Sequence, residues 1–80
     1  MNRVSVRLAG DEYVIRGDDS PQHLEDVAQA VEAKLLEMQE TNPKLAKTQL
    51  AMLVALTLAD ELCKLRREHE EVLRLLGEAK

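Results

Sequence analysis

The strongest hydrophobic pattern of the chain lies in its C-terminal half. An apolar block from Leu50 to Ala59 continues into a ladder with alternating steps of four and three residues. The ladder comprises Leu58, Leu62, Leu65, His69, Val72 and Leu76. Such heptad spacing keeps one seam of a helix facing a partner helix. We therefore predict a helix that begins at Pro43 or near Ala46 and ends at Gly77 as a C-cap, about 50 Å long. Because the rest of the chain is too short to cover this rod, we expect self-association.

The charged residues that flank the ladder bear on how two helices would pair. With Leu58 at a d position, Glu61 falls at g and Arg66 at e. A parallel, in-register dimer would place Glu61 of one chain beside Arg66 of the other. An antiparallel pair would bring Glu61 and Glu68 together. We expect the parallel form, but an exposed ion pair is worth only about 0–1 kcal/mol, so both stay open. The predicted dimer interface comprises Leu50, Leu53, Leu58, Leu62, Leu65, His69, Val72, Leu76, Glu61 and Arg66.

Two features of the ladder leave further alternatives. His69 either rotates outward to solvent or to Glu68 and Glu70, or faces its counterpart across the dimer axis, where protonation would weaken the coil. Leu73 and Leu75 widen the apolar stripe on either side of the seam. A dimer of dimers through this tip therefore stays open beside the simple dimer.

The N-terminal residues alternate between apolar and polar side chains, as in a half-buried strand. A two-residue type II′ turn at Gly10-Asp11 would make this segment one arm of a hairpin. Leu8 would then lie opposite Tyr13, and Val6 opposite Ile15. The apolar side chains would share one face, and the other face would carry Ser5, Arg7, Val14 and Arg16.

A helix is predicted from Pro21 to about Gln39. Ser20 is placed to cap it, and proline is favourable in the first turn. One apolar stripe follows the helical period and comprises Leu24, Val27, Ala28, Val31, Leu35 and Met38. Acidic residues, Glu32 among them, are expected to face water. Thr41-Asn42-Pro43 breaks the pattern, because a residue before proline avoids the helical region.

Length and composition bound the fold class. The chain has 80 residues, no Trp, no Phe and one aromatic residue, Tyr13. Its core must be built from aliphatic side chains, which is typical of packed helices. We expect an α+β, mostly α, fold in a single domain, residues 1–80. Residues 1–45 would form a globular head with the hairpin and first helix, and residues 46–80 the long helix and coiled-coil tail.

The same totals exclude several function classes. With a net charge of −4 and one aromatic residue, the chain lacks the basic, aromatic face of a nucleic-acid binder. The apolar block is about half as long as a membrane helix, and no signal peptide is expected. We predict no metal, cofactor or small-molecule substrate, since no ligand spacing or catalytic motif is present. Cys63 stands alone, as in a reducing cytoplasm.

Two segments resemble the ZapA family of bacterial cell-division proteins. They are residues 4–16, with Gly10 at the turn, and residues 42–65. The matching residues in the long helix are Leu50-Ala51, Leu53, Ala55-Leu56 and Ala59-Asp60-Glu61-Leu62. The resemblance implies a non-enzymatic cytoplasmic homodimer that binds the tubulin-like GTPase FtsZ. Such proteins cross-link and bundle FtsZ protofilaments and stabilise the division ring at midcell.

The resemblance also implies that charged residues of the head face FtsZ. By position, the candidates are Arg3, Arg7 and Arg16 on the outer face of the hairpin, with Lys34, Lys44 and Lys47 as weaker ones. The hairpin turn departs from some relatives, because Asp11 and Glu12 are acidic. The competing interpretation is a generic helical dimerisation or adaptor module for an unrelated partner.

Overall fold

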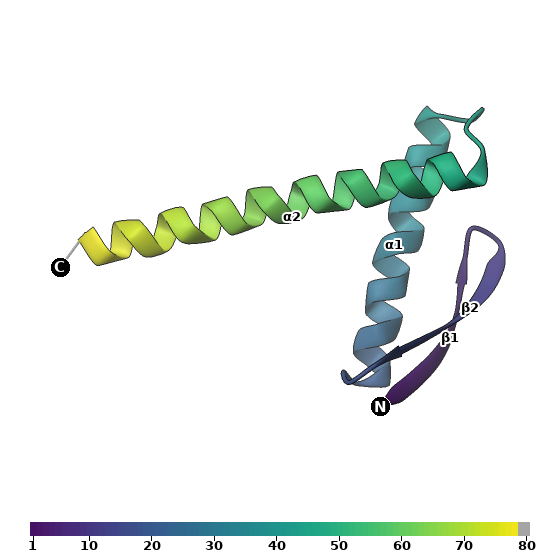
Figure 1. Ribbon diagram of the computed structural model, residues 1–80, viewed down its shortest axis with the longest axis horizontal. Helices are drawn as coiled ribbons and strands as arrows, with labels where there is room; N and C mark the ends of the chain where they lie inside the picture. The colour runs from purple at the N-terminus through teal and green to yellow at the C-terminus, as the bar shows by residue number, and fades with distance from the viewer. Residues whose placement is uncertain (79–80) are drawn as a thin grey trace.

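The computed structural model describes residues 1–78, and within them the chain forms a hairpin followed by two helices (Figure 1). The elements are β1 (Asn2–Leu8), β2 (Asp11–Gly17), α1 (Pro21–Thr41) and α2 (Lys47–Glu78). The hairpin lies along one side of α1, and the first turns of α2 cross the C-terminal end of α1 (Figure 1). The predicted α+β class and the order of its elements are confirmed.

The hairpin turn differs from the prediction. The two loop residues are Ala9 and Gly10, with φ of 52° and 85°, so the turn is of the primed type that needs positive φ at both positions. The type II′ turn predicted at Gly10-Asp11 was wrong. A left-handed backbone costs a residue with a side chain about 1–2 kcal/mol. At Ala9 a contact offsets this cost, because its N–H donates to the Glu32 carboxylate at 3.0 Å. Glu32, expected to face water, is half-buried and anchors the turn to α1.

The change of turn also changes the strand register. Val6 lies opposite Tyr13, and Val4 opposite Ile15, so each cross-strand partner is displaced by two residues from the predicted pairing. Side chains of a strand alternate between faces with a period of two. The displacement therefore leaves every side chain on its predicted face while replacing its neighbour.

Both ends of α1 are capped by side chains. Ser20 Oγ accepts the backbone N–H of His23 at 3.2 Å, as predicted for an N-cap. The helix continues to Thr41, two residues beyond its predicted end. There the Asn42 side-chain amide donates to the carbonyl of Met38 at 3.0 Å. The short connection expected before the second helix is present.

The second helix begins at the later of its two predicted starts. The N–H of Ala46 donates to the side-chain oxygen of Gln49 at 3.1 Å, which satisfies one of the free donors at the helix start. From Lys47 the helix runs to Glu78. Gly77 lies inside the helix and does not cap it, contrary to the prediction.

The core divides into two clusters that meet at Leu8. The first lies between the hairpin and the N-terminal half of α1, and it contains Val4, Val6, Leu24 and Ala28, with Leu8 and Ile15 packed against it. The second lies where α1 crosses α2. It contains Leu35, Leu50 and Val54, with Leu8, Ala9, Val31, Met38 and Leu58 packed against it. Thus the hairpin and the start of α2 are both attached to α1.

Candidate interaction surfaces

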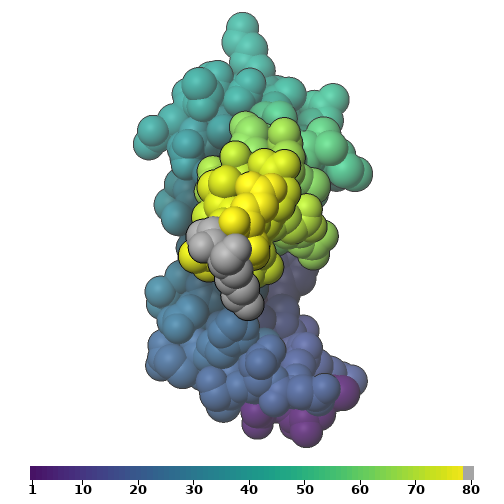
Figure 2. All heavy atoms as spheres, turned by 90° about the vertical axis from the view of Figure 1, so that its left-hand side faces the viewer, coloured from purple at the N-terminus to yellow at the C-terminus, as the bar shows by residue number. Residues whose placement is uncertain are grey.

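The distal part of α2 is the first candidate surface. Every residue from 59 to 78 is exposed, and this part of the helix projects away from the hairpin and α1, toward the viewer in Figure 2. The predicted seam remains uncovered along it, and Leu65, for example, is 62% exposed. We call Leu62, Leu65, His69, Val72 and Leu76 the tail seam. Burying a leucine side chain is worth about 1.5–3 kcal/mol, so an uncovered seam favours association.

The N-terminal part of the predicted interface has a different environment. Leu50 is only 6% exposed and packs against Leu35 and Val54 of its own chain. Leu58 is half-buried at the edge of the same cluster, and Leu53 is also half-buried. Leu50 therefore has little surface left for a partner, because α1 already covers it. The interface role predicted for Leu53 and Leu58 stays a prediction for the surface that α1 leaves open.

An ion pair joins α2 to α1 at the start of the tail seam. Lys34 Nζ donates to Glu61 Oε1 at 2.8 Å and lies 3.4 Å from a carboxylate oxygen of Glu37. The hydrogen bond to Glu61 raises the pKa of Lys34 above its ordinary value of 10.5, although partial burial opposes the shift. Glu61, predicted to reach Arg66 of another chain, thus has a partner within its own chain. Lys34 itself is 18% exposed, so little of its side chain is available to another protein.

The other two lysine candidates differ from each other. Lys47 Nζ donates to Asp11 Oδ2 at 2.6 Å, and this hydrogen bond raises the pKa of Lys47. The contact ties the tip of the hairpin to the first turn of α2. Lys44 lies in the exposed connection between the helices and forms no ion pair with any residue of 1–78. Of the three lysines, Lys44 is therefore the one without an ion pair among residues 1–78.

The outer face of the hairpin is the second candidate surface. The structure brings Arg3, Arg7 and Arg16 together on this exposed face, and Arg3 lies directly opposite Arg16. Like charges at such a position repel each other, so this pair does not stabilise the fold. Arg7 lies opposite Glu12, whose carboxylate accepts the hydroxyl of Ser5 at 3.0 Å. The face is therefore basic, with its positive charge least compensated at Arg3 and Arg16.

Sequence reasoning missed one part of the α2 surface. Met52 and Leu56 are 62% and 65% exposed on the side of the helix that faces away from Leu50 and Val54. Both lie in the apolar block, which is apolar on all sides of the helix. A helix that is buried on one face alone has polar residues on the other face. The apolar residues on every side of this block therefore indicated a second apolar surface.

Within residues 1–78, no group of three or more His, Cys, Asp or Glu side chains converges as a metal site would require. No described helix combines the length and the apolar character needed to cross a membrane. Cys63 is an exposed free thiol on α2.

The sequence and the fold match known proteins over most of their length. The family described as "Cell division protein ZapA" matches residues 4–78. A curated "Cell division protein ZapA" from Shouchella clausii is 40% identical over 68 residues, which are 85% of this chain and 87% of that protein. Another from Geobacillus kaustophilus is 41% identical over 78 residues, which are 98% and 86% of the two proteins.

A solved structure is similar as well. It is described as "ZapA mutant dimer from Geobacillus stearothermophilus", is 39% identical, covers 95% of this chain and 88% of its own, and has a TM-score of 0.77. The matched residues include β1 from Val4 onward, all of β2 and both helices. The resemblance found in the sequence is confirmed, and the chain belongs to the ZapA family of cell division proteins.

Proposed function

We propose that this protein binds FtsZ as a homodimer, cross-links and bundles FtsZ protofilaments, and stabilises the division ring at midcell in the cytoplasm. It acts as a non-enzymatic accessory protein that needs no cofactor. Membership of the ZapA family supports the role in division. The solved relative described as a dimer supports the assembly.

The uncovered tail seam carries the proposal. Residues 59–78 have no contact that hides Leu62, Leu65, Val72 or Leu76 from water, and a second copy of the same seam would hide them. A two-fold dimer presents two copies of every head surface. Two weak contacts on one polymer then act together, since the second binding step becomes intramolecular. Cross-linking filaments needs no chemistry beyond this bivalence.

The FtsZ-facing surface is proposed to be the basic outer face of the hairpin. Arg3, Arg7 and Arg16 share it and are exposed, whereas Lys34 and Lys47 are held in ion pairs within the chain. Lys44 stays a weaker candidate because of its exposed position. A guanidinium group binds carboxylates through two parallel hydrogen bonds, so an acidic region of FtsZ would be a suitable partner surface.

Co-sedimentation with FtsZ polymers tests the proposal. We expect the wild-type protein to pellet with the polymers and to increase the pelleted FtsZ. The double variant Arg7→Glu, Arg16→Glu should lose both effects while remaining a dimer in sedimentation equilibrium. The matched control, Arg67→Glu with Arg74→Glu, makes the same charge change at outer positions of the tail and should behave as wild type.

The outcomes separate the two functional interpretations. A wild-type protein that stays in the supernatant while FtsZ polymers pellet would contradict FtsZ binding and favour the adaptor module. Loss of pelleting in both double variants would show that total charge matters more than the hairpin face, which contradicts the assignment of the surface.

A further inference from the structure

The outer edge of β1 has unused hydrogen-bonding groups. In an antiparallel hairpin with a two-residue loop, the pair next to the loop is hydrogen-bonded and the pairs then alternate. Leu8 and Asp11 form that first pair, so the backbone groups of Arg3, Ser5 and Arg7 point away from β2. Within residues 1–78 none of these three forms a backbone hydrogen bond outside the hairpin. All three are exposed.

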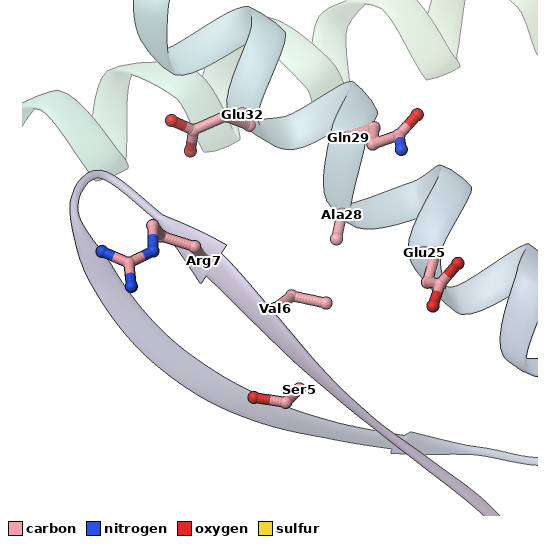
Figure 3. A pocket seen from close by; sticks show the side chains of 7 residues that line it. All are labelled: Ser5, Val6, Arg7, Glu25, Ala28, Gln29 and Glu32. Carbon is pink, nitrogen blue, oxygen red and sulfur yellow. The ribbon is translucent and has the colours of Figure 1, made fainter.

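This edge borders a hollow between β1 and α1. The hollow has a volume of about 250 Å³ and is lined by Ser5, Val6, Arg7, Glu25, Ala28, Gln29 and Glu32 (Figure 3). Val6 and Ala28 point toward each other across it, Gln29 points away from the hairpin, and Glu25 lies on the side of α1 that borders the hollow (Figure 3). A strand edge beside a helix groove is the arrangement that accepts an extended peptide as an additional strand.

The charges along the edge select the kind of segment that would fit. A strand added to β1 would place alternate side chains beside Arg3, Ser5 and Arg7, where carboxylates would pair with the two guanidinium groups. The side chains between them would lie toward α1, over Val6 and Ala28, which favour small apolar groups. Glu32 keeps its negative charge while it accepts the N–H of Ala9, but it belongs to α1, whereas the carboxylates of the added strand would lie on the outer face with Arg3 and Arg7.

A second copy of the chain does not fit the same edge. Symmetric antiparallel pairing of two β1 strands about Ser5 would set Arg3 of each copy against Arg7 of the other. Like charges directly opposite each other are destabilising. Charged residues on an edge strand commonly prevent such self-pairing. The outer edge of β1 therefore disfavours pairing with β1 of a second copy and favours pairing with an acidic strand.

We propose that the outer edge of β1, from Arg3 to Arg7, is a strand-addition site for an extended segment of another protein in which carboxylates alternate with small apolar residues. This site goes beyond the function proposed above, because it defines a mode of binding and not a particular partner. Its test uses this protein and synthetic peptides without FtsZ, so failure of FtsZ binding and failure of this site are distinguishable.

The test is a titration followed by amide NMR. The probe is a seven-residue peptide with blocked ends in which glutamate alternates with valine. We expect signals of Arg3, Ser5 and Arg7 to shift, and exchange of their amide hydrogens to slow by about tenfold as new hydrogen bonds form. A peptide of the same length in which lysine alternates with valine should cause neither effect.

Two matched proline variants separate strand addition from attraction between charges. Ser5→Pro removes an outward N–H from the edge of β1, and Val14→Pro makes the same change at the opposite position on the free edge of β2. Proline is tolerated on edge strands when the lost N–H faces outward. We expect Ser5→Pro to abolish the shifts and Val14→Pro to retain them.

A double charge variant provides a second test if Ser5→Pro fails to fold. Arg3→Glu with Arg7→Glu should reverse the preference, so that the lysine peptide binds and the glutamate peptide does not. Three outcomes would overturn the proposal: no shift at β1 with either peptide, equal binding by both proline variants, or shifts confined to α2. Equal binding would mean a charge contact without strand addition.

Discussion

The head of the molecule, taken from here on as residues 1–58 so that it includes the packed start of α2, and the tail, residues 59–78, contain similar kinds of apolar side chains but differ in where these lie. In the head, leucines and valines from β1, α1 and the first turns of α2 meet in two clusters. In the tail, every residue is exposed, including four large apolar residues of the seam. One helix, α2, belongs to both regions, so its surroundings change along its length while its secondary structure does not.

This comparison separates the two conditions that an apolar residue must meet to be buried. The residue must lie on the correct face of its element, and a second element must reach it. Leu50 and Leu65 both satisfy the first condition, but α1 reaches only Leu50. In the head, α1 buries the apolar side chains of α2, whereas in the tail only another molecule can bury them. Head and tail should therefore respond differently to mutation.

The largest effect is expected in the tail seam. Leu65→Asp would place a charge in each of the two copies of the seam and remove two leucines from the interface. Each leucine contributes about 2 kcal/mol, so self-association should weaken by about a thousandfold or more. Sedimentation equilibrium measures this. Cys63→Asp adds the same charge two residues away, outside the seam, and should leave the dimer intact. Unchanged association of the Leu65 variant would contradict the tail interface.

A slightly smaller effect is expected in the core of the head. Leu35 is 8% exposed, whereas its neighbour Leu36 is 55% exposed. Leu35→Ala should lower the free energy of unfolding by about 2–5 kcal/mol, because it leaves a cavity between α1 and α2. Leu36→Ala should change it by less than about 0.5 kcal/mol. Urea unfolding at one fixed protein concentration compares them. Equal losses would mean that Leu36 is covered in the assembled protein.

The hairpin turn should show an effect of about 1 kcal/mol in either direction. Asn-Gly is the favoured sequence for a turn with two positive φ values, so Ala9→Asn should stabilise the protein. Gly10→Ala should destabilise it, since a side chain at a left-handed position is strained. Thermal unfolding of both variants measures the change. A lower melting temperature for Ala9→Asn would contradict this prediction. It would mean that the larger side chain disturbs the hydrogen bond between the backbone N–H of residue 9 and Glu32.

The smallest effect is expected at the ion pair between head and tail. Because Glu61 raises the pKa of Lys34 in the folded chain, the stabilisation is fully present below the ordinary lysine pKa of 10.5. It is lost as the pH rises through the higher, folded value. Lys34→Gln should therefore melt lower than wild type at neutral pH and converge with it in strong alkali. Lys44→Gln, where no ion pair is present within residues 1–78, should match wild type throughout.

The sequence was most reliable where a signal repeats along one element. The two helices, the break at Thr41-Asn42-Pro43 and the apolar face of the hairpin all follow from periodicity and capping residues. Its errors were local choices between neighbouring positions. The observed turn lies one residue before the predicted turn, because Ala9 adopts positive φ where its N–H donates to Glu32. Glu32 lies 23 positions later in the chain, so the local sequence does not indicate this contact.

The candidate sites show the same division. Arg3, Arg7 and Arg16 share an exposed face in both the predicted and the observed register, because the two registers differ by two residues and side chains alternate with the same period. The lysines could not be ranked from sequence, since their partners Asp11 and Glu61 come close only when the hairpin, α1 and α2 pack together. The exposed side of Met52 and Leu56 was missed for a related reason: an all-round apolar block does not indicate which side a neighbour will cover.

The sequence by itself determined the elements, the face on which each side chain lies and the excess of apolar surface on the long helix, because each of these depends on spacing within one segment. Only the tertiary structure decided which part of that surface α1 covers, which charges are paired and which strand edge stays open. Those outcomes depend on contacts between segments distant in sequence, and no local pattern encodes the distance between them.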